Sequence, residues 1–225
     1  MTRTGIKTLE RTIRRGSGGR PTREEAEARD VRLLDVATRL FMERGFDGTS
    51  IDAVAETAGI SKPTVYARYR DKRDLFAAVL RGRIGKWLAP VSAAAEAQAT
   101  ETNPKSIKTT LHELSRHMVA YTLAPEAGAL QRILSAQAVQ FPELAIANEE
   151  GWLRAVRGVA SILRQSAARG QIKVDDPELA ADMFLNLVLG HPKRLTLYGT
   201  ATDPKTEERH RKAAVEFFLS GIRAK

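Results

Sequence analysis

Apolar residues recur at intervals of three and four along almost the whole chain, as the buried faces of α-helices require. No segment shows the strict alternation of apolar and polar residues that a half-buried strand requires. Gly, Pro or a capping residue ends each apolar series. The pattern predicts an all-α protein with helices over about 22–44, 49–58, 61–69, 71–98, 107–124, 126–140, 142–169, 177–189 and 204–222.

The second and third of these helices are short and follow each other closely. Thr49 is a capping residue with a carboxylate three positions later, and an apolar stripe follows it. Gly59 is expected to end this helix in the left-handed conformation. Ser61 is expected to cap the next helix, with Pro63 in its first turn. The segment therefore predicts two helices joined by a tight turn.

The third helix has one apolar and one polar face. Val65 and Tyr69 are four residues apart and are expected to point inward. The opposite face carries small, hydrogen-bonding and basic side chains, which allow a helix to enter the major groove of DNA. Such a face could also be simply solvated, but two capped helices around a glycine turn favour DNA binding.

Residues 31–80 resemble the TetR family of bacterial transcriptional regulators. The resemblance rests on Leu40-Phe41, Gly45-Phe46, Thr49-Ser50-Ile51, Val54-Ala55, Ala58-Gly59, Ser61-Lys62, Thr64-Val65-Tyr66 and Tyr69-Arg70-Asp71-Lys72. The rest of the chain is similar, mainly in helix layout, to the AefR-like branch. The resemblance implies a flexible basic arm over 1–22, a three-helix helix-turn-helix domain over 23–75, and a helical effector-binding and dimerisation domain over 76–225.

A ligand-responsive repressor is the function that this resemblance implies. It would bind a palindromic operator as a homodimer and be released by a small-molecule effector; an activator or an effector-independent DNA-binding protein is the alternative. Base contacts are expected from Thr64 and Arg68, and phosphate contacts from Thr49, Tyr66 and Lys72. The full set expected at the DNA is Thr49, Ser61, Lys62, Pro63, Thr64, Tyr66, Ala67, Arg68 and Lys72.

Basic residues are concentrated in the N-terminal part of the chain. Residues 1–86 contain 19 Lys and Arg against 12 Asp and Glu, whereas residues 87–225 contain 17 against 15. An excess confined to the part with the two short helices indicates phosphate as a partner. Residues 1–22 form either a solvated tail or an arm that reaches the minor groove. In the second case the arginines nearest the folded domain are the best placed: Arg14, Arg15 and Arg20.

Composition excludes several other classes. The 225 residues contain no cysteine, which excludes disulfides and thiol chemistry and suits a reducing compartment. No run of about 18 apolar residues occurs, so no membrane span is expected. The four histidines are scattered, and no metal-ligand or catalytic motif is found. We therefore expect a cytoplasmic, non-enzymatic protein without metal or cofactor.

Two further groups of residues are assigned through the family layout. Aromatic, methionine and histidine side chains of the middle helices either belong to the core or line a mostly apolar effector cavity: Trp87, His117, Met118, Tyr121, Phe141 and Trp152. The last two helices are apolar over a wide face, either as ordinary core or as a four-helix dimer interface: Met183, Phe184, Leu187, Val188, Val215, Phe218 and Leu219.

Overall fold

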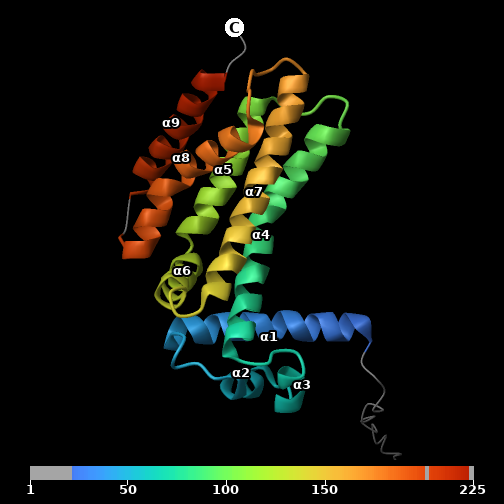
Figure 1. Ribbon diagram of the computed structural model, residues 1–225, viewed down its shortest axis with the longest axis vertical. Coiled ribbons are helices and arrows are strands. Elements are labelled where there is room, and N and C mark those ends of the chain that lie inside the picture. The colour runs from blue at the N-terminus through green and yellow to red at the C-terminus, as the bar shows by residue number, and fades with distance from the viewer. Residues whose placement is uncertain (1–21, 201–202, 223–225) are drawn as a thin grey trace, which may run out of the picture.

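The computed structural model describes residues 22–200 and 203–222. Within these residues the fold is all-α, as predicted, and no strand is present. Figure 1 shows a small helical domain at the foot of a long bundle. The helices are α1 (Arg23–Arg44), α2 (Ile51–Ala58), α3 (Lys62–Tyr66), α4 (Lys72–Thr100), α5 (Ile107–Leu123), α6 (Pro125–Gln137), α7 (Pro142–Ala168), α8 (Pro177–Tyr198) and α9 (Pro204–Ile222).

Local capping interactions set the start of each helix in the small domain. Thr22 and Glu25 form the predicted capping box of α1, with both reciprocal hydrogen bonds present. The cap of α2 differs from the prediction by one residue. Ser50, and not Thr49, accepts the hydrogen bond from the backbone of Ala53. Thr49 is buried instead, and its hydroxyl donates to the carbonyl of Gly45 at 2.8 Å.

An aromatic cluster holds the small domain together. The rings of Phe41 and Phe76 meet edge to face with centroids 4.9 Å apart, and Phe46 meets Phe76 at 5.6 Å. Around these rings pack the inner faces of α1, α2 and α3. The same apolar cluster extends into the larger domain through three leucines of α6 and α7, namely Leu130, Leu134 and Leu144.

Helix α4 connects the two domains without a break. It spans 29 residues, or about 43 Å at 1.5 Å per residue, and Pro90 lies inside it. The boundary predicted at residue 75 therefore falls inside a continuous helix, whose first turns belong to the core of the small domain. Glycines on α7 let the two long helices approach closely: a Cβ at Gly158 would lie 2.5 Å from Val91.

Helix α8 contradicts one prediction. The helix predicted over 177–189 stops before Gly190-His191-Pro192, but α8 continues through these residues to Tyr198 and ends at Gly199 in the left-handed conformation. Proline removes one intrahelical hydrogen bond and costs about 3 kcal/mol in a helix interior. Here Pro192 and Leu195 are both buried, and their spacing continues the apolar stripe of α8. Burial along this stripe offsets the cost of the proline.

Candidate DNA-binding surface and ligand cavity

The orientation of α3 is as predicted. Gly59 ends α2 at φ 66°, in the left-handed region, and lets the chain turn directly into α3. Val65 and Tyr69 are 1% and 5% exposed, so both are anchored in the core as predicted, although α3 ends at Tyr66 and not at residue 69. The residues from Ser61 to Arg68 that are expected to contact DNA are all exposed, with Tyr66 at 48%.

Carboxylates of neighbouring elements pair with the cations on this surface. Lys62 Nζ lies 2.6 Å from Asp52 Oδ2, and this hydrogen bond lowers the pKa of the Asp52 carboxyl. The Arg68 guanidinium pairs with Asp30 of α1. Because both pairs are solvent-exposed, each contributes little to stability, so DNA phosphates and bases can displace the carboxylates at small cost.

Ser61 and Thr64 form a hydroxyl pair at the start of α3. Their side-chain oxygens are 2.6 Å apart, and Ser61 makes no capping hydrogen bond to the backbone. The prediction that the Ser61 side chain caps α3 is therefore wrong, although Ser61 does occupy the N-cap position. Both hydroxyls face solvent and can exchange this mutual hydrogen bond for one to DNA. Pro63 lies in the first turn, as predicted.

Lys72 lies at the N-terminus of α4, at the edge of the same surface. Its ammonium group donates to the backbone carbonyl of Asp47 at 3.3 Å and lies 4.5 Å from the centroid of the Phe46 ring. The amides that open α4 are already occupied, because Asp71 accepts from the backbone of Arg73 and Asp74. A phosphate here would therefore be held by the lysine, and not by the free helix N-terminus.

One residue of the predicted DNA-contact set, Thr49, is buried, and three others lie outside the described residues. The Thr49 hydroxyl is buried and donates to the carbonyls of Leu40 and Gly45, at 3.1 and 2.8 Å. These bonds tie the end of α1 to the start of α2, which is a structural role. The arm residues Arg14, Arg15 and Arg20 lie outside the described residues.

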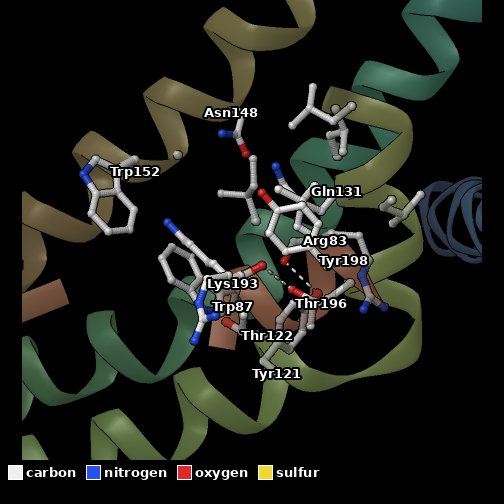
Figure 2. A pocket seen from close by; sticks show the side chains of 18 residues that line it. Arg83, Trp87, Tyr121, Thr122, Gln131, Asn148, Trp152, Lys193, Thr196 and Tyr198 are labelled. Atoms are coloured by element: carbon white, nitrogen blue, oxygen red, sulfur yellow. Dashed lines mark hydrogen bonds between the residues drawn. The ribbon is translucent and has the colours of Figure 1, made fainter. Parts of the chain in front are cut away.

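A cavity of about 430 Å³ opens in the larger domain. Five helices contribute to its wall, from α4 to α8, and Figure 2 shows the side chains that face it. Aromatic rings form much of this wall: Trp87, Tyr121, Trp152 and Tyr198. The size and the mixture of apolar walls with a few polar groups are those of a small-molecule site.

The cavity wall reaches the core of the DNA-binding domain. Leu80, Leu130 and Leu134 line the cavity and also belong to the apolar cluster that contains the aromatic rings of the small domain. The hydroxyl of Tyr121 donates to the carbonyl of Arg83 at 2.9 Å and so joins α5 to α4 at this level. A molecule in the cavity would contact side chains that belong to the same apolar cluster as the core of the small domain.

The predicted cavity residues separate into two groups. Trp87, Tyr121 and Trp152 line the cavity, whereas Met118 is fully buried in the core. Phe141 packs against Phe46 of the small domain, with ring centroids 5.9 Å apart. His117 lies away from this cavity, at a separate hollow between α4 and α5.

The polar residues of the cavity were not predicted, apart from Tyr121. They include Arg83, Gln131, Asn148, Lys193 and Arg194. Two of them lie in the part of α8 whose helical continuation the sequence pattern missed. The continued apolar spacing across Pro192 was the signal that could have placed them on a helix.

Few of the residues predicted for dimerisation are exposed. Phe184, Val188, Val215, Phe218 and Leu219 are buried in the core of the single chain. Met183 and Leu187 are 57% and 38% exposed, and Leu179 and Phe217 are exposed beside them. Helices α8 and α9 pack side by side at the edge of the bundle away from α4 (Figure 1). We call these four exposed apolar side chains the α8–α9 patch: Leu179, Met183, Leu187 and Phe217.

The described residues contain neither a metal site nor a membrane-spanning helix. In the part of the chain that the structure describes, no three His, Asp or Glu side chains gather in a way that could hold a metal ion. None of the helices there is long and apolar enough to cross a membrane.

Comparison with known families identifies the class of protein. Residues 33–79 match the family described as "Bacterial regulatory proteins, tetR family". Residues 109–221, half of the chain, match the "AefR-like transcriptional repressor, C-terminal domain". The helix-turn-helix fold and these matches define a DNA-binding transcriptional regulator and not an enzyme. The chain belongs to the TetR family.

Individual relatives agree with this assignment. The chain is 38% identical over 60 residues to the HTH-type transcriptional regulator AcrR of Shigella flexneri, and 38% identical over 66 residues to RutR of Escherichia coli K12. These matches cover 27% and 29% of this chain, and the chain spans less than a third of the length of either relative.

Solved structures extend the similarity to nearly the whole chain. A TetR-family regulator from Mesorhizobium loti is 29% identical, with a TM-score of 0.80 over 91% of this chain and all of the other. The flavonoid-responsive regulator FrrA is 28% identical, with a TM-score of 0.64 over 88% of this chain and 99% of its own.

Proposed function

We propose that this TetR-family regulator is a ligand-responsive repressor that binds a palindromic operator as a homodimer. A small molecule in the α4–α8 cavity would release it from DNA. The observation that carries this proposal is the sharing of Leu80, Leu130 and Leu134 between the cavity wall and the core beneath α1 and α4. Its site of action would be the bacterial chromosome in the cytoplasm.

In this proposal each copy of α3 enters one major groove. Thr64 and Arg68 contact base edges, with Lys62 beside them and Ala67 close to a thymine methyl. Tyr66 and Lys72 contact phosphates on either side. Two such helices related by a two-fold axis fit half-sites separated by one helical turn of about 34–36 Å, or a modest multiple.

The α8–α9 patch would supply the two-fold contact. Leu179, Met183 and Leu187 recur every four residues, so they form one exposed apolar stripe on α8, beside Phe217 of α9. Exposed apolar patches of this kind mark interaction sites. A second copy of the same surface makes the closed, symmetric contact that two identical DNA readers require.

Coupling between cavity and DNA follows from the packing of α4 and α6. A ligand that separates Leu80 from Leu130 or Leu134 changes the position of α4 against the small domain. Such a shift would alter the spacing of the two α3 helices, and a coupling free energy of about 1–3 kcal/mol is typical. A regulator similar in fold over most of its length, FrrA, is described as flavonoid-responsive, which supports response to a small molecule here.

The test is reciprocity between DNA and effector. Operator fragments from the upstream region of the gene would be titrated with the protein, with and without a ligand found by thermal-shift screening. The ligand should weaken operator binding about 5- to 150-fold, and saturating operator should weaken ligand binding by the same factor. Ligand affinity that is unchanged by saturating operator would exclude the switch.

Activation of transcription is the alternative function. The chain is 32% identical over 76 residues to a protein named as a transcriptional activator, FasR of Mycolicibacterium smegmatis. That match is confined to about a third of each chain, so it bears mainly on DNA binding. Transcript levels of the neighbouring genes in a deletion strain distinguish the outputs, because loss of a repressor raises them and loss of an activator lowers them.

A further inference from the structure

The polar groups of the α4–α8 cavity have an unusual balance. Three of the side chains that line it are cationic, and none is a carboxylate. They are Arg83, Lys193 and Arg194. The nearest acidic side chains lie outside the wall: Glu126 is 3.4 Å from the Arg83 guanidinium, and Asp182 accepts from the Trp152 indole at 2.8 Å. The cations therefore line the cavity directly, whereas the carboxylates act on it only from outside the wall.

One of the three cations of the wall is Lys193. The residue is exposed to solvent, but its ammonium group lies 3.7 Å from the centroid of the Trp152 ring. No carboxylate of the described residues forms an ion pair with it within 4.0 Å. Desolvation lowers the pKa of Lys193 to about 8, although the charges of Asp182 and Glu149 act in the opposite direction. An anion beside this ammonium group would favour its charged form and offset the cost of its desolvation.

Unused hydrogen-bond donors lie on the same wall. Trp87 Nε1 and Arg83 Nε are buried, and neither has a hydrogen-bond partner within the described residues. Both groups can only donate, so only an acceptor can satisfy them. In Figure 2, Trp87, Trp152 and Lys193 gather on one side of the cavity, and Arg83 faces it from the other. A ligand with several hydrogen-bond acceptors would therefore satisfy the donors of this wall.

The rest of the wall is flat and apolar, which favours a planar ligand. Four aromatic side chains and the leucines of α4 and α6 form flat, apolar faces. Such faces stack on planar rings and leave the charge of a ligand to the polar groups. A cationic ligand would meet like charges on the wall, and a neutral one would give Lys193 no ion pair.

We infer that the effector is a flat aromatic anion, whose ring system packs against Trp87 and Trp152 and whose acidic group binds Lys193. An aryl carboxylate and an acidic phenolate share this chemistry. The inference deepens the proposed function, on which it rests, by assigning the chemical class of ligand to the cavity.

The two tryptophans make the test direct. The chain has only two, Trp87 and Trp152, and both line the cavity, so intrinsic tryptophan fluorescence reports its occupancy. The full chain would be titrated with naphthalene-2-carboxylate and with its neutral isostere, naphthalene-2-carboxamide. A parallel arm with 2,4,6-trichlorophenolate distinguishes a carboxylate from a phenolate as the preferred acidic group.

The carboxylate should bind at least about tenfold more tightly than the amide. Lys193→Met should remove this preference by weakening the carboxylate about tenfold and leaving the amide within about twofold. Lys193→Arg keeps the charge and should keep the preference. Lys205→Met, on the exposed start of α9, is the matched control and should behave as wild type. Far-ultraviolet circular dichroism checks that each variant is folded.

Several results would overturn the inference. These are equal or tighter binding of the amide, an unchanged preference in Lys193→Met, or no response to any of the anions. Operator binding is measured in the same samples to separate the two proposals. An anion that occupies the cavity without releasing DNA contradicts the switch alone, whereas release by acid and amide with equal potency contradicts the anion site alone.

Discussion

At the scale of single residues, the three cations proposed to contact DNA all have partners within the same chain. Lys62 and Arg68 are each held by a carboxylate of the same chain, while Lys72 rests on an aromatic ring. These partners fix where each charge sits before DNA arrives. Because they come from α2, α1 and the loop before α2, the small domain positions its own DNA contacts.

Replacing Arg68 and Lys72 should have different effects on DNA recognition. Arg68→Ala is expected to cost about 1–3 kcal/mol on the best operator and to relax base preference at one position in each half-site. Lys72→Ala should weaken all sequences equally and lower the salt dependence of binding. Selection from a randomised operator library, followed by salt titrations, measures both. Loss of affinity in both variants without any change of preference would contradict this division of roles.

Binding of the effector should be coupled to protonation of Lys193. Its pKa of about 8 means that the group is partly neutral at pH 8 and fully charged at pH 6. A bound anion favours the charged form and raises this pKa, so binding should take up protons at pH 8 and not at pH 6, and affinity should fall as the pH rises through about 8. The charges around this group are those of Asp182, Glu149, Arg83 and Arg194.

Calorimetry of naphthalene-2-carboxylate binding in two buffers of different ionisation enthalpy measures this uptake. Lys193→Arg is the control, because a guanidinium stays protonated over the whole range and should abolish the pH dependence. An identical proton uptake in the arginine variant would show that another group titrates.

At the scale of helices, most boundaries could be predicted because local signals set them. The capping box of α1, the glycine turn after α2 and the Asp-Pro start of α8 all lie where residue chemistry places them. Packing against other helices explains the two helix boundaries that were predicted wrongly. Pro192 stays inside α8 because its neighbours are buried, and Thr49 is displaced from the cap of α2 because its hydroxyl ties α1 to α2. The apolar spacing across Pro192 is a local signal of the first effect, whereas the second depends on a contact between two helices and has no local signal.

Contact between α4 and α7 should depend on glycine. A Cβ at Gly158 would lie 2.5 Å from Cγ1 of Val91, which is 1% exposed and has no room to move. Gly158→Val is therefore expected to lower the free energy of unfolding by about 1–3 kcal/mol. Thermal and urea unfolding measure the change.

Gly82→Ala is the matched control for this variant. Gly82 lies in the interior of α4 with nothing within 4 Å of a Cβ, so alanine should stabilise the protein by about 0.5–1 kcal/mol. An unchanged free energy of unfolding in Gly158→Val, or a lower one in Gly82→Ala, would contradict this account of the two glycines.

At the scale of the whole molecule, α4 is the common element of both sites. Its first turns belong to the core under α3, and its middle lines the cavity. The sequence analysis predicted this long helix and three of the aromatic residues on the cavity wall, Trp87, Tyr121 and Trp152, but not Tyr198. It could not predict which side chains face inward, because that depends on how α4, α6, α7 and α8 are rotated against one another.

Dimerisation through the α8–α9 patch should be a condition for tight operator binding. Met183 is 57% exposed in the single chain, so Met183→Glu should leave the fold intact but place an unpaired carboxylate in a contact between copies. We expect dimer dissociation to rise at least about tenfold, a cost of about 1.4 kcal/mol or more. Sedimentation velocity over a range of concentrations measures the dissociation.

Operator binding should fall with the dimer. A monomer reaches one half-site only, so Met183→Glu should lose most of its affinity for a two-half-site fragment and little of its affinity for an isolated half-site. Ile146→Glu is the matched control, because Ile146 is equally exposed, at 58%, but lies on α7 outside the patch. If the Ile146 variant dissociates and the Met183 variant stays dimeric, the two copies meet through another face, and the spacing of the DNA readers must be set there.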